Sequence, residues 1–301
     1  MVVSNLQYIK LRVILQAEES GRLPPFLGST IRGVLGHSMR DLVCLAPKVK
    51  CHTCIHANNC HYATYFNPPG SVAGSVKPYV IYTPLSNKTH WYKGDLLSFD
   101  ITFFGDSILA IDYLITGLLN IENYGWGAQR LSFSLKHIIN QIDGSLVWSG
   151  GNTWLDHLTP TSVKDEGRLA NSVLIRLNSP TRILVQQKLL KELQFKDIIQ
   201  AIMTRMKLIY HGYVGLVLEW DEERLLEGAE QITRVEAEWE FIDFKRYSFT
   251  YNRQLKLPSI MGYARFEGNL TPYTPLLELG QLLQIGKNTT HGFGHYNLYY
   301  A

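Results

Sequence analysis

The sequence has no apolar run long enough to cross a membrane. A spanning helix needs about 20 consecutive, mostly apolar residues, and no stretch of the 301 residues approaches that length. The first residues also lack the basic and then apolar pattern of a secretory signal. We therefore expect a cytoplasmic protein that has no membrane partner.

Acidic residues are scarce in one part of the chain. Between positions 20 and 94, Asp41 is the single acid, against eight lysines and arginines and five histidines. Positions 213–243 reverse this balance, with ten acids against Arg224 and Arg234, although the net charge of the whole chain is only +3. Such a separation favours a positive surface that binds a polyanion. The alternative is a set of uneven faces that are merely solvated.

Cysteine is rare, and its distribution is informative. All four cysteines lie within positions 44–60 with the spacing C-x6-C-x2-C-x5-C, as Cys44, Cys51, Cys54 and Cys60. The cytosol disfavours disulfides, whereas clustered thiols that include a C-x2-C pair are typical of metal sites. We predict structural zinc; an iron–sulfur cluster would use the same ligands, and unligated thiols are the remaining alternative. Because four thiolates close the coordination of zinc, we expect no catalytic metal.

Hydrophobic periodicity predicts the same order of elements in both halves of the chain. In the first half we expect strands over residues 6–16, 78–85, 95–105 and 131–139, with helices over 26–44 and 106–123. In the second half we expect strands over residues 171–185, 234–255 and 260–270 and at the C-terminus, with helices over 190–211 and 274–285. Each half therefore has the βαββαβ order of a ferredoxin-like domain.

This duplication defines the predicted domains. The fold class is α+β, with two tandem ferredoxin-like (RAMP/RRM-like) domains at 1–145 and 169–301, and a hydrophobic content of 46% is enough for two cores. A cysteine-rich insertion occupies 45–76 of the first domain. Residues 146–168 are polar and rich in Gly, Ser and Thr, which suits a linker or an inserted hairpin.

A glycine-rich loop near the C-terminus is the most distinctive stretch of the sequence. It joins an apolar helix to the last strand and contains Gly286, Lys287, Asn288, Thr289, Thr290, His291, Gly292, Phe293, Gly294 and His295. Glycine permits positive φ angles and close approach of backbone N–H groups to a ligand. The loop lacks the Walker spacing and runs from helix to strand, the reverse of nucleotide-binding glycine loops. A tight turn and a phosphate-binding loop are both consistent with this pattern.

The first predicted helix has an unusual polar face. Its Gly33 and Gly36 each cost about 1 kcal/mol relative to alanine within a helix, so we expect another backbone or a bound chain to approach them. His37 lies on the same face, in the net of i, i+3 and i, i+4 neighbours that includes Arg32 and Arg40.

On these residues the chain resembles the RAMP superfamily, and within it the CRISPR-associated Cas six family of repeat-processing endoribonucleases. The resemblance rests on the duplicated βαββαβ order, the helix motif over residues 23–33, the cysteine segment, the motif Gly262-Tyr263-x-Arg265-Phe266-x-Gly268 and the terminal loop over residues 286–296. It covers nearly the whole chain. The terminal loop is specific to the superfamily, while the helix motif and the cysteine segment are typical of one branch of the family.

The resemblance implies an activity and a mechanism. Such enzymes cut repeat RNA in a CRISPR precursor without a catalytic metal, by attack of a 2′-hydroxyl that leaves a 2′,3′-cyclic phosphate and a 5′-hydroxyl. It implies repeat RNA as a partner, possible contact with effector subunits and no DNA partner. The glycine-rich loop is expected to bind RNA, through Lys287 and the backbone of residues 289–294. We expect Phe293 to stack on a base, as single-stranded RNA recognition requires.

The reaction needs a base, an acid and a cation beside the phosphorane. Histidine suits proton transfer, and His37 is our predicted base, supported by the place of the catalytic histidine in the family. Arg40 is the predicted cation for the phosphate, with Arg32 one turn further back as an RNA contact. His61 and Tyr62 form the alternative pair, and the general acid stays unassigned. A helix-surface histidine without a catalytic role is the plainer explanation of His37.

Two other functions fit the same sequence. One is a RAMP subunit that holds guide RNA without cutting it, as part of an effector complex. The other is a zinc-dependent hydrolase, which would lose activity on chelation while its fold survived.

Overall fold

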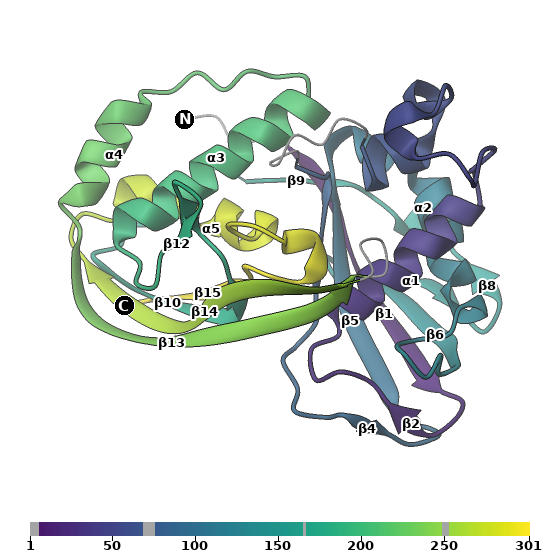
Figure 1. Cartoon of the computed structure of the whole chain (residues 1–301). Coiled ribbons are helices and arrows are strands. Elements are labelled where there is room, and N and C mark those ends of the chain that lie inside the picture. Colours follow the sequence, from purple (N-terminus) through teal and green to yellow (C-terminus); the bar gives the residue numbers. More distant parts are fainter. Residues whose placement is uncertain (1–5, 69–75, 165–166, 249–252) are drawn as a thin grey trace. The chain divides into compact units, whose positions relative to one another are not determined.

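The protein has two compact units, each built on its own antiparallel sheet (Figure 1). The computed structural model describes residues 6–68, 76–164, 167–248 and 253–301. Residues 6–162 and 208–215 form the N-terminal unit, and residues 163–207 and 216–301 belong to the C-terminal unit.

The N-terminal unit contains a sheet with the strand order β3-β5-β1-β6-β7-β8, and β9 pairs with the start of β1. Two helices, α1 (Gly28–Asp41) and α2 (Ile111–Leu119), lie against this sheet, and a short ribbon pairs β2 with β4. The strands are β1 (Gln7–Ala17), β2 (Gly21–Arg22), β3 (Tyr79–Tyr82), β4 (His90–Trp91), β5 (Leu96–Phe104), β6 (Phe133–Asn140), β7 (Leu146–Ser149), β8 (Asn152–Thr153) and β9 (Thr161–Ser162).

Alternation of side chains along β1 creates the core of this unit. Ile9, Leu11, Val13 and Leu15 are buried at every second position, as expected for a strand with one face toward the helices. Gly117 of α2 has no side chain, and a Cβ there would lie 2.2 Å from the sulfur of Met39. The two helices therefore pack closely, and this contact fixes α1 on the sheet.

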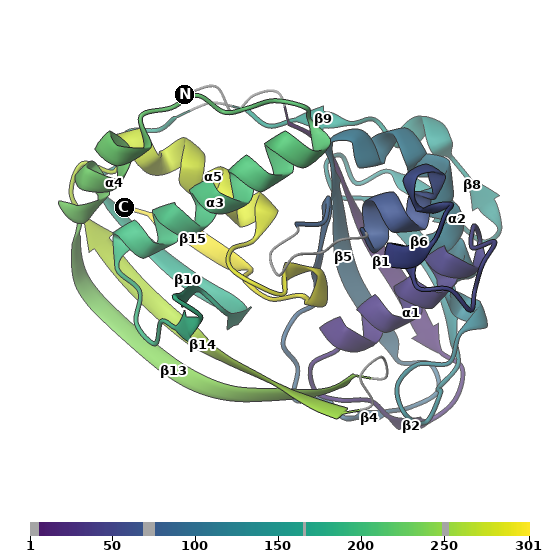
Figure 2. The same cartoon turned by 45° about the horizontal axis from the view of Figure 1, so that its top comes forward.

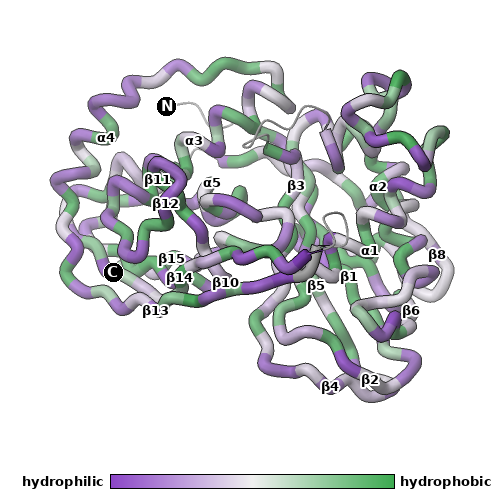
Figure 3. The backbone as a smooth tube through the Cα atoms, in the orientation of Figure 1, coloured by the Kyte–Doolittle hydropathy of each residue, from purple (hydrophilic) through white to green (hydrophobic). Residues whose placement is uncertain are grey.

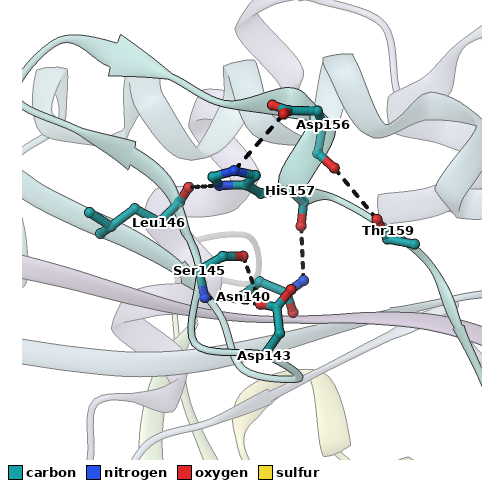
Figure 4. A network of polar contacts seen from close by, with 7 residues as sticks. All are labelled: Asn140, Asp143, Ser145, Leu146, Asp156, His157 and Thr159. Atoms are coloured by element: carbon teal, nitrogen blue, oxygen red, sulfur yellow. Dashed lines mark hydrogen bonds and ion pairs between the residues drawn. The ribbon is translucent and has the colours of Figure 1, made fainter.

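Residues 146–162 contain the strands β7, β8 and β9 of this sheet, so they are not the free linker that the composition suggested. The strands β7 and β8 form the inserted hairpin that was the alternative. Figure 4 shows how the following turn is tied back: the amide of Asn140 donates to the carbonyl oxygen of His157 at 2.9 Å, and the imidazole Nδ1 of His157 lies 2.6 Å from the carbonyl oxygen of Leu146. Of the expected linker, residues 165–166 lie outside the described residues.

The C-terminal unit contains a sheet with the order β13-β14-β10-β15, and α3 and α5 cover one of its faces (Figures 1 and 2). A short ribbon pairs β11 with β12. The strands are β10 (Ser172–Thr181), β11 (Leu184–Val185), β12 (Lys188–Leu189), β13 (Thr233–Ser248), β14 (Arg253–Glu267) and β15 (Tyr296–Tyr300), and the helices are α3 (Phe195–Tyr213), α4 (Glu222–Glu230) and α5 (Thr274–Leu283).

Helix α4 was absent from the sequence prediction. It is only nine residues long, and its apolar side chains, Leu225, Leu226 and Ala229, are too few to establish a helical period on their own. Asp221 starts the helix, because its carboxylate accepts the backbone N–H of Arg224 at 3.0 Å.

Both sheets have the strand order of a ferredoxin-like domain, which confirms the predicted fold class. In each unit the first strand lies between the third and fourth strands of the βαββαβ motif. The expected insertion at 45–76 consists of short turns over Cys51–Thr53, Ala57–Asn59 and Tyr62–Phe66, while residues 69–75 lie outside the described residues. Within the described part of the chain, every helix is too short or too polar to cross a bilayer.

We expect alanine substitutions at Gly294 and Gly33 to change the free energy of unfolding in opposite directions. Gly294 has a φ of +80°, and a Cβ there would lie 1.9 Å from the carbonyl oxygen of Ile285. Gly33 lies inside α1 with nothing within 4 Å of its Cβ position. We expect Gly294→Ala to lower the free energy of unfolding by about 2 kcal/mol or more, and Gly33→Ala to raise it by about 1 kcal/mol. Chemical denaturation measures both, and equal losses would contradict the assignment.

Candidate nucleic-acid site on the first helix

His37 lies on the exposed side of α1, next to a tyrosine that an acid holds in place. Its ring is stacked on that of Tyr124, with 6.3 Å between centroids and 20° between planes. The hydroxyl of Tyr124 donates to Oδ2 of Asp41 at 2.7 Å. Burial, and then the bond to Asp41, raise the pKa of Tyr124 to about 12. The structure thus groups an imidazole, a phenol that stays protonated and a carboxylate.

The two helix glycines have different surroundings. Beside Gly36, the guanidinium Nη1 of Arg32 would lie 2.6 Å from an added Cβ, and the ring of Phe66 at 3.4 Å. The atoms nearest to Gly36 are thus side-chain atoms of Arg32, from the same helix, and of Phe66, and not the other backbone or bound chain that was expected. At Gly33 no described atom comes within 4 Å, so the helix surface near His37 has room for a ligand.

Arg32 and Lys77 form a group of cations in the N-terminal unit. The guanidinium of Arg32 lies over the ring of Phe66 at 3.9 Å and donates to the carbonyl oxygen of Phe66 at 3.2 Å. Burial, and then the nearby charge of Arg32, lower the pKa of Lys77 to about 8. The sequence has no acid between positions 42 and 94, which makes this group well suited to an anionic ligand.

The guanidinium of Arg40 is directed toward the cysteine segment. Its Nη2 donates to the carbonyl oxygen of Pro47 at 2.6 Å and lies 3.5 Å from that of Val49, in the cysteine segment. A hydrogen bond with Cys44 is the main reason why the pKa of Arg40 is raised. These contacts direct the guanidinium toward the cysteines, so the structure does not pair Arg40 with His37 beside a phosphate.

The alternative pair is packed among aromatic rings. The ring of His61 lies 5.4 Å from that of Tyr113 and 5.9 Å from that of Tyr65. Burial is the main reason why the pKa of Tyr62 is raised. These ring contacts fix His61, while Tyr62 packs on Phe66 with 5.6 Å between ring centroids and has a hydrogen bond with Arg32. The contacts described for the two residues do not include His37 or Tyr124.

The glycine-rich loop is a tightly bonded corner of the C-terminal unit. Gly286, Gly292 and Gly294 have φ values of +76°, +83° and +80°, so the predicted need for glycine is confirmed. The backbone N–H groups of residues 291–294 already donate to carbonyl oxygens of the protein. This contradicts the expectation that these four groups bind phosphate, because each N–H has a single hydrogen.

The side chains of the loop also differ from the expectation. Phe293 is fully buried against Phe244, with 5.1 Å between ring centroids, so its ring does not face solvent where a base could stack. Thr289 and Thr290 are buried, and His295 is half-buried with its backbone N–H bonded to the hydroxyl of Ser179. Lys287 is the exposed cation of the loop.

The equivalent loop in the N-terminal unit has the same construction. Trp126 is fully buried and lies 5.3 Å from the ring of Phe133. In both loops the aromatic residue between two glycines therefore fills the core. Sequence cannot distinguish this from an exposed stacking residue, because both uses need an aromatic side chain beside flexible backbone.

A second basic feature, the far end of the β13–β14 hairpin, was not predicted. Lys245 and Lys256 lie directly opposite each other, and Arg253 is also exposed there. Figure 3 shows the hydrophilic character of this end. Like charges in opposite positions destabilise a hairpin, so an anionic ligand would relieve this repulsion. Asp243 pairs with Lys245 at 2.9 Å but leaves an excess of positive charge.

The four cysteines line one cavity of about 170 Å³, together with His56 and His61. All four are half-buried and free of disulfides. Among the described residues, no three Cys, His, Asp or Glu side chains are already grouped as metal ligands.

Sequence comparisons divide the chain at the same place as the structure. A family model described as an N-terminal domain, AF_1859_N, matches residues 6–161, and the model of the CRISPR-associated endoribonuclease Cas6 matches residues 175–296. An uncharacterized protein of Archaeoglobus fulgidus is 27% identical over 158 residues, which are 52% of this chain and 54% of that protein. The match thus spans about half the length of that relative.

Solved structures show the same fold over the whole chain. Thermus thermophilus Cas6 has a TM-score of 0.57 at 12% identity, with 98% of this chain and 99% of that chain covered. A Cas6 product complex reaches 0.60 at 14% identity over 97% and 100%. A chain of a partial Cas6-RT-Cas1–Cas2 complex reaches 0.62 at 15% identity, over 99% of this chain and 47% of that one. The AF_1859_N model covers about half of the chain, so the chain belongs to that family; its residues 175–296 match the model of the CRISPR-associated endoribonuclease Cas6, and its fold is the one seen in Cas6 structures.

Proposed function

We propose that this protein is an endoribonuclease that cuts CRISPR repeat RNA without a catalytic metal, and that His37 of α1 is its general base. The observation that carries the proposal is that His37 is exposed and stacks on Tyr124. The hydroxyl of Tyr124 donates a hydrogen bond to Asp41. The match of residues 175–296 to the Cas6 endoribonuclease model supports the substrate class, and the open surface at Gly33 gives room for a ribose and phosphate beside the helix.

The proposed step is an internal transfer within the RNA. His37 removes the proton of a 2′-hydroxyl, and that oxygen then bonds to the adjacent phosphorus. The bond from phosphorus to the 5′-oxygen breaks, and this oxygen takes up a proton. The products are a 2′,3′-cyclic phosphate and a 5′-hydroxyl.

Lys77 is our candidate for the general acid. A lysine with a pKa of about 8 is still protonated at neutral pH, yet it releases its proton more readily than an ordinary lysine. The charge of Arg32 lowers the pKa of Lys77. The guanidinium of Arg32 lies next to Gly36, the residue before His37, where it would stabilise the negative charge of the phosphorane. Arg32 therefore replaces Arg40 as the proposed phosphate contact.

A non-catalytic RNA-binding subunit remains the second candidate. It is favoured by the internal bonds of Arg40 and of the loop N–H groups at 291–294, which leave fewer preformed donors for a transition state. The two candidates differ in whether the RNA is cut.

The first prediction concerns the base. Incubated with its repeat RNA in EDTA, the wild-type protein should give fragments ending in 2′,3′-cyclic phosphate, and His37→Ala should cut at least about 100-fold more slowly. His211→Ala removes another exposed helix histidine and should cut at the wild-type rate. Uncut wild-type RNA would favour the second candidate. Equal rates for His37→Ala and wild type would remove His37 from the mechanism.

The second prediction concerns Lys77. If its ammonium is the acid, the cleavage rate should fall as pH rises through about 8, because the protonated fraction falls. Lys77→Met should cut about 100-fold more slowly, and yet be more stable at neutral pH by up to about 3 kcal/mol, the equivalent of the pKa shift. Lys77→Arg keeps the charge but cannot release its proton, so restored cleavage in that variant would show that charge alone is needed.

The third prediction concerns RNA affinity. Lys287→Ala and Lys256→Ala should each weaken binding and reduce the slope of log affinity against log salt by about one, as expected for a lost phosphate contact. Lys196→Ala is the control, because that lysine is ion-paired with Glu230. Fluorescence anisotropy over a salt series measures the effect. An unchanged slope for Lys287→Ala would leave the glycine-rich loop as a structural turn.

A further inference from the structure

The segment between α1 and the turn at Tyr62–Phe66 has almost no core of its own. Of residues 42–62, only Ala57 is buried, whereas Leu45 is 80% and Ile55 is 91% exposed. Ordering a chain costs about 1–2 kcal/mol per residue, and so little apolar burial does not offset that over such a length. Another interaction is needed to hold the segment in one conformation.

Short turns place the cysteines near one another. The backbone N–H of Cys54 donates to the carbonyl oxygen of Cys51 at 3.2 Å, which closes a turn over the C-x2-C pair. A second turn closes where the N–H of Cys60 donates to the carbonyl oxygen of Ala57 at 3.3 Å. Cys44 follows the end of α1, and its N–H donates to the carbonyl oxygen of Arg40 at 2.9 Å. All four side chains line the same cavity.

The charges around the cavity suit an anionic centre. Zinc with four thiolates carries a net charge of −2, and no acid lies between positions 42 and 94 to repel it. The side chain of Arg40 reaches from α1 into this segment and contacts Cys44, while Lys48 and Lys50 belong to the segment itself. A zinc–thiolate site would thus explain why the guanidinium of Arg40 is directed toward the cysteine segment and not toward His37.

We propose that Cys44, Cys51, Cys54 and Cys60 bind one zinc ion that folds this segment and fixes the end of α1. Binding releases four thiol protons and forms four zinc–sulfur bonds. The thiols surround the cavity without converging in the described structure, so rotation of their side chains accompanies binding. A redox-inert ion also suits thiols that are only half-buried. None of the four cysteines takes part in the proposed RNA cleavage.

Metal analysis tests the proposal on the whole protein. Purified without chelators, the chain should contain about one zinc ion, and a mercurial reagent should release it as four thiols react. The chain has four cysteines in all, so each titrated thiol belongs to the site. Cobalt in place of zinc should give the visible absorption of a tetrahedral thiolate complex. Iron with sulfide, or absence of bound metal after zinc reconstitution, would overturn the proposal.

Single substitutions then test the ligands. Cys51→Ser and Cys54→Ser should lose the zinc and unfold at lower temperature, whereas His52→Ala, in the same turn, should retain it. His56 lines the cavity, and loss of zinc from His56→Ala would overturn a site made of four thiolates. Because a serine variant can fail to fold, the cobalt spectrum of the wild-type chain decides independently whether thiolates bind the ion.

Discussion

The packing of α1 on the first sheet is the constraint on which both proposed sites depend. Ile31, Leu35 and Met39 are completely buried, and Gly117 allows α2 to approach Met39 closely. Two further rows of residues run along the helix beside this buried stripe. One row presents Gly33, His37 and Asp41, and the other presents Arg32, Gly36 and Arg40.

The two rows of α1 contact different parts of the N-terminal unit. His37 and Asp41 contact Tyr124, which makes their row a candidate for proton transfer. The row with Arg32 and Arg40 faces Phe66 and the cysteine segment. Arg32, in the first half of the helix, lies near Lys77. Arg40, near the end of the helix, contacts Pro47 and Cys44 in the cysteine segment. Arg32 and Arg40 therefore belong to two different sites, although both lie in the same row of α1.

Much of the fold followed from the sequence, since alternating and helical patterns recur in the same order in both halves. Helix α4 was missed because its nine residues are too few to establish a helical period, and the turn fixed by Asn140 and His157 was missed because it has no apolar pattern. At the site, His37 was found from its place on a helix with glycines. Tyr124 and Lys77 were not, because their significance comes from contacts with Asp41 and Arg32, which are distant in sequence. The burial of Phe293 likewise depends on its contact with Phe244.

The long β13–β14 hairpin has one further property. β10 pairs with β14 only from Ile260 onward, so the pairs from Ile242↔Ser259 to Ser248↔Arg253 belong to a ribbon of two strands. Such ribbons twist more than wider sheets and open more easily. Phe244 of this ribbon packs against the buried Phe293, so only the pairs beyond it, from Lys245↔Lys256 to Ser248↔Arg253, can change their twist independently of the sheet. Lys245 and Lys256 lie just beyond this contact, on the part of the hairpin that can change its twist without disturbing the core.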